Sequence, residues 1–293
     1  MNVLTGTAPI SGPHFIEEYV GGGGVHVFNI GEEHTNRNAC WRDGHDIVDV
    51  MMACLDEGLC LYLEMPPRFE TRRHASVECP SKPDDAPRED FLNDLRTCSV
   101  AALSKGLHVK FVDLREAAGP LPFTREEEEF VAREKQRTLQ GDPGGAHRNI
   151  TNRFHGGLIK VKTGVTAECD EFLSIINNQG RGDVDQYVCS EWKKRVTDLC
   201  NGVGDVLQLP FPQYVDESLK CYRAAMDDAM NLYCVWLIAR HRAGKVRNPP
   251  PPAVFYGGSA HCIVLARDLK ALGFRLVGGH AGSSAQSCIR RPR

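Results

Sequence analysis

The chain has 293 residues, of which 42% are hydrophobic, so it can bury a sizeable core. Its formal net charge is −3 and its basic residues are interleaved with acidic ones, so we expect no nucleic-acid partner. No apolar run approaches the roughly 20 residues that span a bilayer, and the first residues lack the features of a secretory signal. We therefore expect no membrane partner and a cytoplasmic location.

The cysteines fit that expectation. The sequence contains 12 of them, and several lie in apolar periodic runs, as at Cys54, Cys98 and Cys262. Cysteine at such positions serves as a small core residue. No C-x-x-C pair occurs, which argues against a structural zinc site. We therefore expect free thiols in a reducing compartment.

The first part of the chain alternates between strand and helix patterns. Residues 1–24 are rich in Gly and Pro, and we expect a flexible N-terminal segment there. Residues 25–114 form the first half of an α/β domain. Strands are predicted at 25–30, 59–65 and 107–113, with helices over 47–55 and 92–103 between them. This alternation predicts parallel strands joined by right-handed crossovers.

The alternation is interrupted and then resumes. Residues 115–248 predict a mainly helical insertion, with helices over 124–140, around 187–199 and over 216–241. Residues 249–280 form the second half of the α/β domain, with a strand at 253–257, a helix over 261–272 and a last strand at 274–277. A flexible tail is expected over 281–293. The sequence thus predicts a three-layer α/β/α fold with a mainly parallel sheet and a large helical insertion.

Ionisable residues follow the predicted strands. Glu32 and His34 come after the first strand, Glu64 after the second and Asp113 after the third, and His261 follows the strand at 253–257. In an open parallel sheet, ligands bind outside the carboxyl ends of the strands. We therefore expect these side chains to gather at one edge of the sheet.

Each of these residues also has a structural explanation. His34 could be a loop histidine or a helix cap, and His261 could be an ordinary residue of a helix N-terminus. Glu64 could simply point into water, and Asp113 could pair with Arg115. We favour a functional role for the two histidines and Glu64, because such groups at the end of a buried strand are costly without a partner or a use. Asp113 is left open between the two explanations.

Three features together resemble a known superfamily. They are a Gly-Glu-Glu-His motif at 31–34, an apolar strand that ends at Glu64, and a Gly-Ser-Ala-His motif at 258–261. This combination resembles the erythromycin esterase/ChaN superfamily, which includes the TraB and Tiki proteins. The resemblance covers residues 25–65 and 253–277 and is nearest to the ChaN-like proteins.

The resemblance implies hydrolysis of an ester or peptide bond in a small-molecule or peptide substrate. His34 would act as general base on a water, and Glu32 and Glu64 would orient the water or the imidazole. His261 would complete the site as a second base, an electrophile or a ligand, and Asp113 is a further catalytic candidate.

The same resemblance implies candidate cofactors. His34, His261, Glu32 and Glu64 together suit a divalent metal ion such as zinc, manganese or cobalt. Haem is the second possibility, with Tyr256 as a candidate ligand, although a strand tyrosine usually belongs to the core. Two further functions therefore stand beside the hydrolase. One is a non-catalytic haem- or metal-binding protein of the ChaN type, and the other is a scaffold protein that kept the fold and lost the activity.

Overall fold

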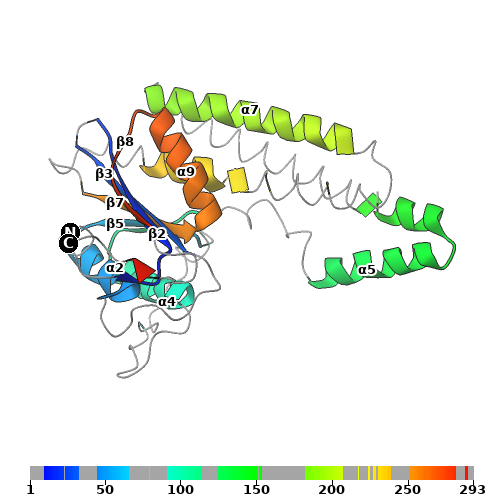
Figure 1. The fold of residues 1–293 in the computed structure, drawn as a ribbon, viewed down its shortest axis with the longest axis horizontal. Coiled ribbons are helices and arrows are strands. Elements are labelled where there is room, and N and C mark those ends of the chain that lie inside the picture. Colours follow the sequence, from blue (N-terminus) through cyan, green and yellow to red (C-terminus); the bar gives the residue numbers. More distant parts are fainter. Residues whose placement is uncertain are drawn as a thin grey trace. The chain divides into compact units, whose positions relative to one another are not determined.

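The computed structural model describes residues 10–22, 24–32, 45–65, 79, 91–113, 125–150, 152–153, 182–206, 217, 224, 227–228, 230–238, 251–281 and 288–289. The chain divides into two compact units (Figure 1). The first combines Met1–Asp113 with Tyr233–Arg293, and the second is Leu114–Leu232.

The first unit contains a six-stranded sheet in the order β6-β5-β7-β3-β2-β8. Its strands are β2 (Phe15–Val20), β3 (His26–Glu32), β5 (Cys60–Leu63), β6 (Val109–Phe111), β7 (Ala253–Gly258) and β8 (Arg275–Ala281). The strands β6, β5, β7 and β3 are parallel, whereas β2 is antiparallel to both β3 and β8. All strands except β2 therefore end at the same edge of the sheet. A smaller sheet joins β1 (Ile10–Ser11), β4 (His45–Asp46) and β9 (Cys288–Ile289) in the order β4-β1-β9.

Helices cover both faces of the larger sheet, so the predicted three-layer α/β/α architecture is confirmed. On one face, α2 (Ile47–Asp56) packs beside α4 (Phe91–Ser104). On the other face, α9 (Ser259–Ala271) contacts β3 and β7 (Figure 1). A helix at 230–238 reaches the same side as α9, where the Tyr62 hydroxyl donates to the carbonyl oxygen of Leu237 at 3.5 Å.

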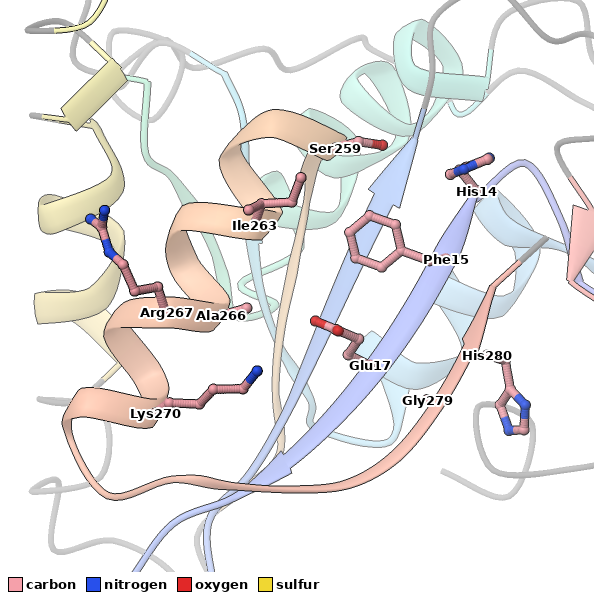
Figure 2. A pocket seen from close by; sticks show the side chains of 10 residues that line it. All are labelled: His14, Phe15, Glu17, Ser259, Ile263, Ala266, Arg267, Lys270, Gly279 and His280. Atoms are coloured by element: carbon pink, nitrogen blue, oxygen red, sulfur yellow. The ribbon is translucent and has the colours of Figure 1, made fainter. Parts of the chain in front are cut away.

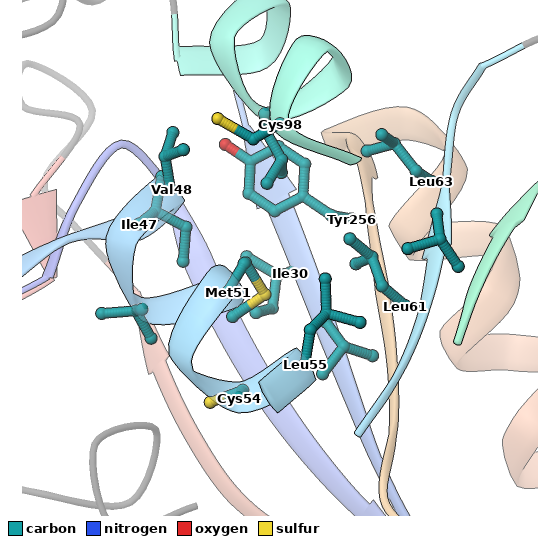
Figure 3. Close-up of a cluster of buried hydrophobic side chains, with 14 of the residues drawn as sticks. Ile30, Ile47, Val48, Met51, Cys54, Leu55, Leu61, Leu63, Cys98 and Tyr256 are labelled. Carbon is teal, nitrogen blue, oxygen red and sulfur yellow. The ribbon is translucent and has the colours of Figure 1, made fainter. Parts of the chain in front are cut away.

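The main hydrophobic core lies between the sheet and α2 with α4 (Figure 3). Alternate strand residues supply it, including Ile30 of β3, Leu61 of β5 and Tyr256 of β7. Because side chains alternate along a strand, the intervening residues face α9. One of them, Asn29, is fully buried and donates to the carbonyl oxygen of Cys262 in α9 at 2.9 Å.

The second unit is helical in its described part. It contains α5 (Arg125–Leu139), α7 (Asp183–Val206) and helical residues at 143–150. Arg195 of α7 pairs with Asp228 at 3.1 Å and with Glu191, one turn earlier, at 3.6 Å. Across the described part of the chain, no helix combines the length and apolarity that crossing a membrane requires.

Two segments that were expected to be flexible contain strands. The segment 1–24 contains β2, which lies inside the sheet between β3 and β8. Its buried residues, Ile16 and Tyr19, are three positions apart and therefore lie on opposite faces of the strand. That spacing hides the strand from a search for period-two patterns. In the tail 281–293, β9 pairs with β1.

The cysteine prediction also needs a correction. Cys79 and Cys98 form a disulfide, although Cys98 is fully buried in the core, as its apolar context indicated. Its partner lies in a Pro-rich charged stretch that the sequence pattern does not pair with any helix. In the described part, Cys54, Cys60, Cys189, Cys234 and Cys262 are thiols outside any disulfide. The expectation of a reducing compartment rested on all cysteines being thiols, and this disulfide contradicts that premise.

Three buried tyrosines predict a loss of stability in alkali. Burial raises the pKa of Tyr19, Tyr62 and Tyr256 above the ordinary value of 10.0. In the unfolded chain these groups ionise near pH 10, so the folded state keeps its full stability below that pH and loses it as the pH rises further. The loss is up to about 1.4 kcal/mol per pH unit for each tyrosine.

This prediction is checked by following tyrosinate absorbance and circular dichroism together as the pH rises. We expect three of the seven tyrosines to ionise only as the fold is lost. Ionisation of every tyrosine near pH 10, with the dichroism unchanged, would contradict it.

Candidate active site

Glu64 and His261 form a buried carboxylate–imidazole pair. Glu64 directly follows β5, and its backbone N–H donates to the carbonyl oxygen of Tyr256 in β7 at 3.2 Å. His261 lies in the first turn of α9. Its Nε2 is 3.6 Å from Oε1 of Glu64, and the two side chains are 9% and 7% exposed. This separation lies within ion-pair range and is somewhat longer than a hydrogen bond.

The protein fixes Glu64 at several atoms. Its Oε2 accepts a hydrogen bond from the backbone N–H of Gly258 at 2.9 Å. Its carbonyl oxygen accepts two hydrogen bonds from the Arg96 guanidinium in α4, at 3.3 and 3.0 Å. Gly257 provides the space, because a Cβ there would lie 2.8 Å from the Phe255 ring and 3.1 Å from Oε2 of Glu64. The carboxylate thus lies across the end of β7 and the start of α9.

Glu32 has a different partner. The Tyr256 hydroxyl donates to its Oε2 at 2.6 Å, and both residues are buried. Burial raises the pKa of Tyr256 well above its ordinary value, and the charge and hydrogen bond of Glu32, followed by the charge of Asp46, add to that rise. The hydroxyl therefore stays protonated and remains a donor. Asp46 is itself buried and caps α2 by accepting from the N–H of Val48 at 2.8 Å.

The two carboxylates lie on opposite faces of β7. Tyr256 belongs to the core on the α2 side, whereas the Cβ direction of the next residue, Gly257, points at Glu64. Successive residues of a strand face opposite sides of the sheet. Glu32 therefore contacts the buried hydroxyl of Tyr256 on the α2 side, and Glu64 contacts His261 on the α9 side.

The other predicted site residues have different outcomes. Asp113 is buried just after β6, where its backbone N–H donates to the carbonyl oxygen of Met65 at 3.0 Å. It lies at the expected edge of the sheet. His34 lies outside the described residues, so its proximity to the other groups stays a prediction.

Sequence reasoning missed three features of this edge. It treated Tyr256 as a possible cofactor ligand and did not pair it with Glu32. It also omitted Asp46, although an Asp directly before an apolar periodic run is a signal for a helix N-cap. The Gly258 N–H could not be found from the sequence, because its donor role depends on the local turn from β7 into α9.

Among the described residues, no group of three or more His, Cys, Asp or Glu side chains is placed to hold a metal ion. The predicted metal set includes His34, which those residues do not cover. For haem, the hydroxyl of Tyr256 is buried and bonded to Glu32, and its raised pKa disfavours the phenolate that ligates iron. These contacts favour a structural role for Tyr256.

No protein-family model, curated protein or solved structure matches the chain. The resemblance to the erythromycin esterase/ChaN superfamily therefore rests on the two Gly-x-x-His motifs and Glu64 alone.

Proposed function

We propose that this protein hydrolyses an ester or peptide bond, with His261 as general base on a water and Glu64 as the carboxylate that orients it. The observation that carries this proposal is the buried Glu64–His261 pair, held by the Gly258 N–H. It differs from the sequence-based expectation, which gave the role of base to His34. Glu64 directs its carboxylate toward His261, and this contact supports the new assignment.

The proposed chemistry follows from the arrangement of the pair. Nε2 of His261 faces Glu64, so Nδ1 is the nitrogen that takes a proton from the water. The carboxylate fixes the orientation of the ring and stabilises the imidazolium that forms. Histidine is the side chain that most often serves as a general base, and it later returns the proton to the leaving group. A divalent metal ion held with the help of His34 would supply further polarisation of the water.

A turnover assay on purified protein tests this proposal. Nitrophenyl esters of graded acyl length and a fluorogenic peptide library are incubated with wild type, His261→Gln and His108→Gln, each with and without a chelator. His108 is an exposed histidine of the same unit and serves as the matched control.

We expect at least one substrate to be hydrolysed by wild type and by His108→Gln, and not by His261→Gln. Loss of activity on chelation, restored by zinc, manganese or cobalt, would identify metal assistance. Equal activity in all three proteins would contradict the role of His261, and no turnover of any substrate would contradict the hydrolase itself.

A further inference from the structure

A groove of about 780 Å³ runs along α9, and neither Glu64 nor His261 lines it. Its walls come from α9 on one side and from β2 and β8 on the other. Figure 2 shows Ile263 and Lys270 of α9 facing Phe15 and Glu17 of β2 across it. Its volume is within the range of about 300–1,000 Å³ that is typical of small-molecule sites.

Two glycines shape the groove. A Cβ at Gly31 would lie 2.4 Å from the Phe15 ring, so this glycine provides the space that the ring occupies beside β3. Gly279 of β8 pairs in register with Glu17, and a Cβ there would meet nothing closer than 3.8 Å. Since paired residues face the same side of a sheet, the absent side chain of Gly279 leaves space beside Glu17.

The lining combines apolar surface with the carboxylate of Glu17 on β2 and two cationic side chains on α9. Ile263 is 67% exposed and presents an aliphatic surface to the groove, next to Phe15 and Ala266. Oε2 of Glu17 already accepts from the Tyr19 hydroxyl at 2.9 Å and from Nδ2 of Asn29 at 3.2 Å.

Arg267 and Lys270 are the two cations at the far end of the groove, and they differ in their ion-pair partners. Arg267 donates to Oδ1 of Asp268 at 3.2 Å. Lys270 has no ion-pair partner in the part of the chain that the structure covers. Its ammonium is therefore the charge left for a ligand.

We propose that this groove binds an amphipathic carboxylate, with its apolar chain or ring on Phe15 and Ile263 and its anionic end on Lys270. The distance from Ser259 to Lys270 along α9 is about 16 Å, because a helix rises 1.5 Å per residue. A medium-length acyl chain or a small ring system fits that length. The binding does not depend on the proposed hydrolase activity.

The apolar part of the site is tested by filling it. Decanoate binding to the full-length protein is measured by isothermal titration calorimetry in wild type, Gly279→Leu and Gly278→Leu. Gly278 is the matched control, because it is the neighbouring residue of β8 and its Cβ direction meets Glu18, on the opposite face of the strand, at 3.6 Å. We expect one site per chain, a loss of affinity of about tenfold or more in Gly279→Leu, and none in Gly278→Leu.

The charged part is tested with Lys270→Glu and the control Lys105→Glu, an exposed lysine that follows α4. Decanoate is expected to bind about three- to tenfold more weakly to Lys270→Glu alone, whereas decanol binds both variants equally. Equal decanoate affinity in Gly279→Leu and Gly278→Leu, or in the two lysine variants, would overturn the proposal. So would light scattering that shows a wild-type dimer dispersed by Gly279→Leu, because a second copy would then occupy the groove.

Discussion

Replacing His261 and Glu64 together is expected to cost no more hydrolytic activity than replacing His261 alone. The carboxylate acts through the imidazole, with Nε2 and Oε1 separated by 3.6 Å, so it has nothing to orient once the imidazole is gone. His261→Gln should lower kcat by about 10²–10⁴-fold. Glu64→Gln should lower kcat by about 10-fold or more, because the ring loses the group that stabilises its protonated form. Residues that act as one unit give non-additive losses.

The measurement is kcat and KM for wild type, both single variants and the double variant, at one pH and with one substrate. Glutamine preserves the volume of Glu64 and keeps an oxygen to accept from the Gly258 N–H, so the fold should survive. Thermal unfolding of each variant checks this. Losses that multiply in the double variant would show that the two residues act independently, which contradicts an orienting role for Glu64.

The sequence predicted the edge of the sheet where ionisable groups gather, and the reason is local. Gly31, Gly257 and Gly258 stand at strand ends, and apolar runs precede them, so both the strands and their direction could be predicted. The pairing of the groups across strands could not. Glu32 and Glu64 follow similar runs, yet they face opposite sides of β7, and this depends on the register between β3, β5 and β7.

The strand β2 shows a second limit. It forms one wall of the groove, but its Gly- and Pro-rich surroundings and the three-residue spacing of its buried side chains conceal it in the sequence. The Phe15 ring occupies its place beside β3 only because position 31 is a glycine, and the sequence pattern explains that glycine as part of the 31–34 motif. A contact between residues of neighbouring strands depends on register, and no periodic pattern within one segment encodes it.

Tyr256→Phe is expected to lower the free energy of unfolding by about 1.5–3 kcal/mol, the cost of losing a hydrogen bond to a charged group. The variant leaves the ring volume unchanged, so no cavity forms in the core. Its effect comes from the buried carboxylate of Glu32, which loses a 2.6 Å hydrogen bond. Urea denaturation followed by circular dichroism measures the change.

The matched control is Tyr62→Phe, a tyrosine on the neighbouring strand β5 that is also buried. Its hydroxyl donates to a neutral carbonyl oxygen at 3.5 Å, so its removal should cost less than about 1 kcal/mol. Equal costs for the two variants would contradict a special dependence of Glu32 on Tyr256. The backbone carbonyl oxygen of Tyr256, which accepts from the N–H of Glu64 at 3.2 Å, is unchanged by this substitution. Tyr256→Phe should therefore lower stability and leave kcat of the folded protein close to that of wild type.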